Sequence, residues 1–375
     1  MRRAIVTIAA VFLVLGAVVG FTHARTITVD DDGPADFNNI QAAIDDANNG
    51  DTVVVADSTY TGDGNRDIDF HGKAITVKSE KGAENCIIDC NATEHYWNRH
   101  RGFSFRSGEG AGSVLDGFTI TNGLAPMELE LYPPWGSYYV GGGIYCRMSS
   151  PTIMNCIIRD NGGGYGGGLA SEYPRSSPMI VNCTFSRNEH SGIFSCYGGS
   201  FPKITGCTFS GNESGVICWA RSRVLLANCI LWSNGPDEIV LWGESSATVS
   251  YCDIKGGWPG TGNIDANPCF ADPNDGDYYL KSQAGRWDAN EGRWVMDDVT
   301  SPCIDAGDPM SPIGPEPFPN GGIINMGAYG GTAEASKSYF NKPPCETIVA
   351  GDVNGDCKVN FLDFRVMALH WLEER

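Results

Sequence analysis

Six oxygen-bearing residues near the C-terminus follow the spacing of a calcium-binding loop. The side-chain ligands stand at loop positions one, three, five, nine and twelve, and are Asp352, Asn354, Asp356, Asn360 and Asp363. The backbone carbonyl of Lys358 falls at position seven. Position six, which is usually glycine, is Cys357, so the bend of the loop needs another support. Because Ca²⁺ prefers oxygen ligands at this spacing, the sequence predicts a bound Ca²⁺ ion.

A second set of charged residues lies at or just after one strand of neighbouring repeats. It comprises Arg159, Asp160, Arg187, Glu189 and His190, with Glu172 on another strand. An arginine can neutralise the carboxylate of a uronate sugar while a base takes the proton beside it, which is the chemistry of a polysaccharide lyase. Charged residues on exposed turns also occur without any such role. Both interpretations stay open.

Three tryptophans are candidates for binding a sugar ring. Trp219 and Trp242 take equivalent positions in consecutive repeats, one residue past an inward-facing position, so both are expected on the outer surface. Trp135 lies in an insertion at residues 124–140 that is rich in acidic and aromatic residues, and residues 95–106 supply positive charge that could lie beside it. Loops packed over the same face would explain Trp219 and Trp242 equally well.

These residues are positioned by a repeat of about two dozen residues. Its clearest marker is a cysteine that recurs at intervals of 27, 24, 22 and 23 residues: Cys156, Cys183, Cys207, Cys229 and Cys252. A period in this range is typical of a solenoid, in which each coil buries its apolar face against its neighbours. Apolar residues alternate within each coil, which indicates two or three short strands per coil. The sequence therefore predicts an all-β, right-handed parallel β-helix.

Other parts of the repeat are expected to be structural. The turn after the cysteine strand ends on an asparagine in successive coils: Asn161, Asn188, Asn212 and Asn234. Stacked asparagines tolerate left-handed backbone geometry and can bond from coil to coil. The recurring cysteines suit a buried thiol, and three pairs outside that series are disulfide candidates: Cys86 with Cys90, Cys269 with Cys303, and Cys345 with Cys357. Helical spacing at residues 40–47 predicts a short helix that caps the first coil.

Residues 1–24 have the features of a secretory signal peptide. Arg2 and Arg3 precede an apolar run from residue 4 to residue 20, and small residues lead to the exit at Ala24. A membrane anchor is the alternative, although no second apolar run follows. Removal of this segment moves the net charge from −19 to −21. The signal peptide predicts a secreted or cell-surface protein. Because so acidic a chain repels nucleic acid and anionic membranes, we expect it to bind neither.

The sequence also resembles known proteins at several places. Residues 40–62, IQAAIDDANNGDTVVVADSTYTG, are similar to the N-terminal cap and first coil of the pectate-lyase-like β-helix superfamily. Three later segments resemble the closing module of bacterial secreted β-helix proteins of the choice-of-anchor Q type: DANPCFADPNDGDYYL at 265–280, SPCIDAGDP at 301–309 and INMGAYGGTAEAS at 324–336. The resemblance implies a β-helix over residues 25–340, with the closing module from about residue 265.

The calcium loop and the stretch after it resemble one dockerin type I repeat. Pro343 and Pro344 mark a linker at residues 341–348, and the repeat occupies residues 349–375. Dockerins attach secreted proteins to a cohesin partner or a cell-surface scaffold, and the resemblance implies the same here. Dockerins pair two such repeats, and this sequence contains one.

Two hypotheses about function follow. In the first, the exported protein binds an acidic polysaccharide along its long face, with cleavage by a lyase or glycosidase as the enzymatic form, and is tethered through its calcium loop. In the second, it is a non-enzymatic adhesion or structural protein of the cell surface. The superfamily contains proteins of both kinds, so the fold does not choose between them.

Overall fold

The structure, a computed structural model, describes residues 24–129 and 137–339, together with Val359, Phe361 and Phe364. The expected signal peptide, apart from Ala24, and the expected linker therefore lie outside the described residues. Among the residues that are described, none belongs to a helix long and apolar enough to cross a lipid bilayer.

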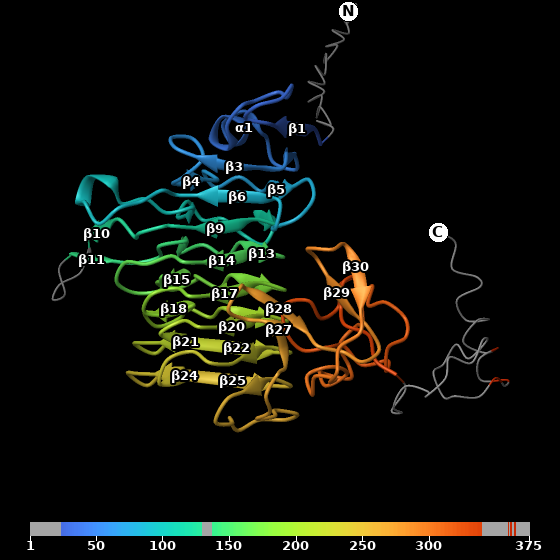
Figure 1. Ribbon diagram of the computed structural model, residues 1–375. Coiled ribbons are helices and arrows are strands. Elements are labelled where there is room, and N and C mark those ends of the chain that lie inside the picture. Colours follow the sequence, from blue (N-terminus) through green and yellow to red (C-terminus); the bar gives the residue numbers. More distant parts are fainter. Residues whose placement is uncertain (1–23, 130–136, 340–358, 360, 362–363, 365–375) are drawn as a thin grey trace, which may run out of the picture.

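The chain winds into a solenoid whose walls are three parallel sheets, here named A, B and C (Figure 1). Sheet A contains β1 (Thr26–Val29), β2 (Thr52–Val55), β5 (Thr76–Ser79), β8 (Val114–Asp116), β13 (Thr152–Met154), β16 (Met179–Val181), β19 (Lys203–Thr205), β22 (Arg223–Ala227) and β25 (Ser246–Ser250). Sheet B contains β3 (Ser58–Thr61), β6 (Cys86–Asp89), β9 (Thr119–Thr121), β14 (Ile157–Arg159), β17 (Thr184–Ser186), β20 (Thr208–Ser210), β23 (Ile230–Leu231) and β26 (Asp253–Ile254). Sheet C contains β4 (Ile68–Asp69), β7 (Phe103–Phe105), β12 (Ile144–Arg147), β15 (Leu169–Glu172), β18 (Ile193–Cys196), β21 (Ser214–Cys218) and β24 (Asp237–Leu241). From β2 to β26 the strands of the solenoid go to sheets A, B and C in turn, which confirms the predicted parallel β-helix.

Side chains from alternating strand positions fill the interior of the solenoid. In sheet A, Ile153, Ile180 and Ile204 lie in register in successive strands and are fully buried. In sheet B, Phe185 stacks on Phe209 with ring centroids 4.9 Å apart and an interplanar angle of 5°. Burial of each such side chain stabilises the fold by about 1.5–3 kcal/mol. Since every coil buries its apolar side chains against the next, the coils stabilise one another.

The asparagines at the corner between sheets B and C form a hydrogen-bonded ladder, as predicted. The backbone N–H of Asn161 donates to Oδ1 of Asn188 at 3.2 Å, and the N–H of Asn188 donates to Oδ1 of Asn212 at 3.0 Å. The N–H of Asn212 donates in the same way to Asn234 at 3.1 Å. The ladder ends on the buried carboxylate of Glu238, which accepts from Asn234. The side-chain amides of these asparagines are hydrogen-bonded inside the wall of the solenoid, so their role is structural.

The recurring cysteines form a second internal column. The N–H of Cys183 donates to Sγ of Cys207 at 3.4 Å, and the N–H of Cys207 donates to Sγ of Cys229 at 3.5 Å. The thiols of this column are free and buried. The prediction that a small buried thiol fills this position in each coil is confirmed.

Two of the three suggested disulfides are wrong, because their cysteines are free thiols in the structure: Cys86, Cys90, Cys269 and Cys303. Cys86 and Cys90 are four residues apart along and just beyond β6, where the extended chain separates their Cα atoms by about 13 Å. A disulfide needs Cα atoms less than about 7 Å apart. The thiol of Cys303 instead donates to Oδ2 of Asp253 at 3.0 Å. Cys345 and Cys357 lie outside the described residues.

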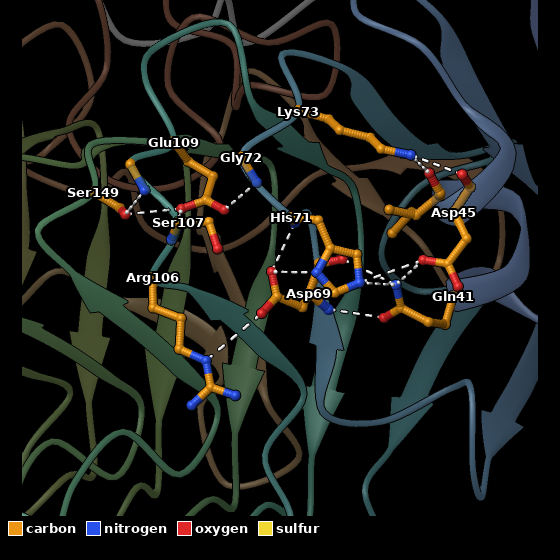
Figure 2. A network of polar contacts seen from close by, with 12 residues as sticks. Gln41, Asp45, Asp69, His71, Gly72, Lys73, Arg106, Ser107, Glu109 and Ser149 are labelled. Atoms are coloured by element: carbon orange, nitrogen blue, oxygen red, sulfur yellow. Dashed lines mark hydrogen bonds and ion pairs between the residues drawn. The ribbon is translucent and has the colours of Figure 1, made fainter.

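The predicted capping helix is α1 (Ile40–Asp46), at the N-terminal end of the solenoid. The side chain of Asn39 accepts an N–H of its first turn, and the buried face consists of Ile40, Ala43 and Ile44. Figure 2 shows how the cap is fastened to the first coils: Lys73 Nζ donates to two carbonyls at the end of the helix, both at 2.8 Å. Gln41 also exchanges hydrogen bonds of 2.9 and 3.0 Å with the backbone of Asp69. The helix thereby covers the open end of the core.

The insertion and its neighbouring segment have short elements of their own. β10 (Met127–Leu129) and β11 (Ser137–Tyr139) form an antiparallel hairpin, and residues 130–136 between them lie outside the described residues. A 3-10 turn, η1 (Tyr96–Asn98), lies in the segment that was expected to supply positive charge.

Residues 265–339 form a C-terminal module that packs on the outer face of sheet B (Figure 1). It contains two hairpins: β27 (Phe270–Asp272) with β28 (Asp277–Leu280), and β29 (Arg286–Asp288) with β30 (Arg293–Val295). The N–H of Gly327 donates to the carbonyl of Asn228 at 2.8 Å, and the N–H of Ala328 donates to Oγ1 of Thr208 at 3.0 Å. An apolar cluster joins module and solenoid: Ile230, Phe270, Tyr278, Leu280, Cys303, Ile304 and Met326. This part of sheet B is therefore covered by the module.

Candidate functional site

Three of the predicted charged residues form an ion-paired cluster at the ends of two neighbouring strands of sheet B. Arg187, after β17, binds Asp160, after β14, through Nε–Oδ1 and Nη2–Oδ2 distances of 2.8 and 2.9 Å. Arg159 Nη1 lies 3.0 Å from Oδ2 of the same carboxylate. Asp160 and Arg187 have φ angles of 56° and 52°. These angles lie in the left-handed region, which allows the chain to turn directly after each strand. Because β14 and β17 pair in register, these turns place the side chains together.

Asp160 is thus shared by two guanidinium groups. Burial raises its pKa, but hydrogen bonds from Arg187 and the charges of both arginines lower the pKa overall. Asp160 is therefore ionised at neutral pH, and the cluster carries one net positive charge. Within the described residues, Nη1 of Arg187 and Nη2 of Arg159 donate no hydrogen bond. The unpaired guanidinium N–H groups suit an anion such as a carboxylate. The cavity that these arginines line also contains the carboxyl groups of Glu84, Asp275 and Asp277.

The two arginines line a cavity of about 430 Å³ between sheet B and the C-terminal module. Its other wall comes from the β27–β28 hairpin: Asn274, Asp275, Gly276, Asp277 and Tyr279. The ring of Tyr279 stacks on Tyr329, with centroids 3.6 Å apart and an interplanar angle of 18°. Burial raises the pKa of Asp277, which lies 3.5 Å from Arg286 Nη1. A volume of this size is typical of a small-ligand site.

Two further cavities adjoin this central one. One of them, called the first cavity below, has a volume of about 550 Å³ and shares Glu84, Ile157 and Tyr329 with the central cavity. The other, called the third cavity below, has a volume of about 650 Å³ and shares Arg187 and Asn274 with the central cavity. The three together are called the crevice below. One side of the crevice is the outer face of sheet B and its turns, and the other side is the C-terminal module.

The remaining two residues of the predicted cluster lie beside sheet C instead. Glu189 Oε2 accepts the N–H of Gly163 at 3.1 Å. The ring of His190 meets Tyr165 edge to face at a centroid distance of 4.7 Å, and burial lowers the pKa of His190. Asn188 is held in the corner ladder, so the chain changes direction before Glu189. The structure therefore brings three of the five candidate residues together and places Glu189 and His190 elsewhere.

Glu172 is buried on the outer face of sheet C, where it accepts a hydrogen bond of 3.0 Å from the hydroxyl of Tyr145. The guanidinium of Arg101 lies over the Tyr145 ring, 4.5 Å from its centroid, and pairs with Glu128 of the insertion at 2.9 Å. Arg99 likewise lies over the ring of Tyr139 in β11, at 4.2 Å. Positive charge from residues 95–106 does therefore lie beside the insertion, where it fastens the hairpin to the solenoid.

The two tryptophans of sheet C differ in exposure. Trp219 is half-buried, and three rings lie around it at centroid distances of 6.3, 6.4 and 6.5 Å: Tyr165, Phe194 and Tyr197. Trp242 follows β24 in the next coil and is 50% exposed. Trp219 is therefore partly covered by neighbouring aromatic side chains, as the alternative interpretation allows, whereas Trp242 is exposed. Trp135 lies outside the described residues.

All six predicted calcium ligands lie outside the described residues as well: Asp352, Asn354, Asp356, Lys358, Asn360 and Asp363. Calcium binding therefore stays a prediction. In the part of the chain that the structure describes, carboxylates of Asp30, Asp31 and Asp32 lie within 4.8 Å of one another on a largely exposed loop. Exposed acidic groups of this kind do not by themselves indicate a bound ion.

Sequence reasoning missed one whole wall of the crevice. This wall contains Asp277, Tyr279 and Tyr329, which belong to segments identified only by their resemblance to a closing module. The spacing of these residues in the sequence does not indicate that they line a cavity with Arg187. They reach the site because the module docks on sheet B, a contact between residues far apart in the chain. Such a contact leaves no local pattern in the sequence.

Comparison with known proteins supports the fold. Residues 48–231 match a family model described as right handed beta helix region, and residues 244–307 match one described as disaggregatase related. No curated protein matches the chain. A pectin methylesterase from carrot is 11% identical with a TM-score of 0.38, over 64% of this chain and 83% of that one. Pectate lyase Pel9A is 16% identical with a TM-score of 0.37, over 82% of this chain and 97% of that one.

Similarity this distant to the two enzymes carries no conclusion about activity. The three parallel sheets and the family match over residues 48–231 show that this chain is a right-handed parallel β-helix protein.

Proposed function

We propose that this protein is exported and binds an acidic polysaccharide in the crevice, where Arg159 and Arg187 bind a carboxylate of the sugar chain. One observation carries the proposal: two guanidinium groups from successive coils share the carboxylate of Asp160 and line the same cavity with unpaired N–H groups. Charge-assisted hydrogen bonds of this kind are about twice as strong as neutral ones. The planar fork of arginine also matches the planar carboxylate of a uronate.

Recognition in this proposal is local, because the protein as a whole is acidic. The expected mature charge of −21 repels a polyanion at long range. At physiological ionic strength, salt screens exposed charges beyond about 8 Å, which reduces this repulsion. Direct contacts between Arg187 and a ligand inside the crevice are screened less. We therefore expect binding to persist at physiological salt.

Calorimetric titration of the mature protein with uronate oligosaccharides tests the proposal. Arg159→Gln and Arg187→Gln should each weaken binding about tenfold or more, since each removes charged hydrogen bonds. Arg221→Gln is the matched control, because Arg221 pairs with Glu244 on an exposed turn outside the crevice. Neutral oligosaccharides of the same length should bind much more weakly. Equal binding by Arg187→Gln and the parent, or equal binding of neutral sugars, would overturn the proposal.

The same samples distinguish an enzyme from a binding protein. Ultraviolet absorbance from unsaturated ends indicates a lyase, and new reducing ends without that absorbance indicate a glycosidase. Retention of polysaccharide with neither product supports the second hypothesis, a non-enzymatic adhesion or structural protein. Arg187→Gln should reduce whichever signal the parent gives.

The C-terminal loop supplies the tether in this proposal. Ca²⁺ would bind the oxygen ligands from Asp352 to Asp363, and the ordered loop would bind a cohesin-like or cell-surface scaffold protein; the support is the ligand spacing. Titration with Ca²⁺ should give heat with the parent and none with Asp352→Ala, and identical titrations would remove the site. For export, N-terminal sequencing of secreted protein should begin at Arg25.

A further inference from the structure

The crevice is longer than a single sugar would need. Its solenoid side runs from Ile87 on β6 to Trp232 just after β23, and passes Thr119, Arg159, Ser186 and Ser210 on the strands between. These six strands are consecutive in sheet B. With neighbouring strands about 4.8 Å apart, the crevice crosses about 24 Å of the solenoid. Asn274 and Tyr279 of the C-terminal module line the same cavity as Ile87, and the module also lines the cavity that contains Trp232.

The first cavity offers groups that bind hydroxyls. Asn155 and Asn182 lie there at the corner between sheets A and B, with Thr184 and Thr332 nearby. The side chain of Asn182 makes no hydrogen bond within the described residues, so its amide can both donate and accept. This pattern suits the hydroxyls of a sugar.

The third cavity offers one partly exposed aromatic ring and a second cation. Trp232 contributes the ring and Lys281 an ammonium group, while Phe270 and Tyr278 line the cavity from the buried contact between module and solenoid. Aromatic rings pack against the apolar face of a sugar, and an ammonium group attracts a carboxylate. Cations therefore lie both at the centre of the crevice, on Arg159 and Arg187, and toward one end, on Lys281.

We infer that the crevice binds an internal stretch of a polyuronate several sugar residues long, with one carboxylate at the arginine pair and another at Lys281. This inference rests on the proposed function and deepens it by naming the class of polymer and its path. The chain crosses the strands of sheet B, passes between the solenoid and the module, and places hydroxyls at Asn182. Ligands that reach only the central cavity use a fraction of these contacts.

Dissociation constants of uronate oligosaccharides of increasing length, measured by calorimetry on the mature protein, test the inference. Affinity should rise stepwise with length and then level off once the crevice is filled. Lys281→Ala and Asn182→Ala should each weaken the longest ligands about fivefold or more and leave the shortest binding ligand unchanged. Arg187→Gln should weaken ligands of every length.

The outcomes separate the two claims. Equal affinity at all lengths, with dependence on Arg187, would overturn the inference and leave the proposed function standing. The inference also fails if Lys281→Ala and Asn182→Ala bind the longest ligand as well as the parent does. Absence of binding at any length would overturn the proposed function itself. Thermal unfolding midpoints close to that of the parent confirm that the variants are folded, because neither side chain belongs to the apolar core.

Discussion

Arg187 and Asp160 lie 27 residues apart in the sequence and form a two-point ion pair between neighbouring coils, with distances of 2.8 and 2.9 Å. Both side chains keep about a third of their surface exposed. Exposed ion pairs contribute little to stability, generally below about 1 kcal/mol. The main consequence of the pair is therefore orientation: it fixes the plane of the Arg187 guanidinium at the wall of the crevice.

Asp160→Asn should lower the free energy of unfolding by no more than about 1 kcal/mol at neutral pH. The pKa of Asp160 is held below its usual value of 3.8, so its contribution is present above that pH and disappears as the pH falls through the lowered value. Urea denaturation at neutral and acid pH measures the difference between parent and variant. A difference that grows on acidification would contradict this account.

Glu316 should make the protein less stable as the pH rises through neutrality. Burial raises the pKa of Glu316 to about 7, although N–H groups of Asn325 and Gly331 donate to Oε1, both at 2.8 Å. The native state therefore binds more protons than the unfolded state between about pH 4.5 and 7, and its stability falls across that window.

Glu316→Gln should remove this dependence and raise the free energy of unfolding at pH 8 by about 1–3 kcal/mol. Denaturant unfolding at pH 5 and pH 8 compares the two proteins. Glu291→Gln, on an exposed hairpin where Glu291 pairs with Arg293, is the control and should behave like the parent. Stability that rises with pH in the parent but not in Glu316→Gln would refute the assignment.

Asn188→Ala should destabilise the protein by about 2–4 kcal/mol. Its Oδ1 accepts from the backbone and the side chain of Asn161, and its Nδ2 donates to the carbonyl of Ile158 at 2.9 Å and to Asn212 at 3.0 Å. Truncation leaves these buried groups without partners, at a cost of about 1–3 kcal/mol each before relaxation. Chemical denaturation measures the effect. Asn38→Ala, at an exposed asparagine, should cost less than about 1 kcal/mol, and equal losses would remove the ladder as the cause.

Trp219→Ala and Trp242→Ala should differ sharply in stability. Trp219 packs among rings on sheet C, so its truncation should cost about 2–4 kcal/mol. Trp242 is 50% exposed, so its truncation should cost less than about 1 kcal/mol. Thermal unfolding of the two variants gives the comparison. Similar midpoints would show that the two indoles have the same environment.

The repeated columns could be predicted from the sequence because every coil puts the same residue in the same surroundings. Cys183 and Cys207 occupy the same position in successive coils and lie in contact in one column. Asn188 and Asn212 do so in the asparagine ladder. A periodic pattern reports on this local environment directly. The capping helix was also predictable, since the spacing of its apolar residues acts within a few residues.

Side-chain direction at the corners was harder to predict. Arg187 and Glu189 are two residues apart in the sequence, yet one lines the crevice and the other binds Gly163 beside sheet C. The ladder holds Asn188 inside the wall and turns the chain there. The disulfide suggested between Cys86 and Cys90 failed for a related reason, because both side chains enter the core from one extended segment.

The sequence by itself determined a parallel β-helix with structural cysteine and asparagine columns and a capped first coil, because these features depend on contacts that recur in every coil. Only the tertiary structure decided that the C-terminal module covers sheet B and that Tyr279 and Asp277 face Arg187 across a cavity. In that contact, the module packs on the outer face of sheet B, and the strands of each part are already formed by contacts within that part. The two surfaces fit each other only after both parts have folded, so the sequence does not show the contact. The candidate site exists at this contact because neither surface alone encloses a ligand.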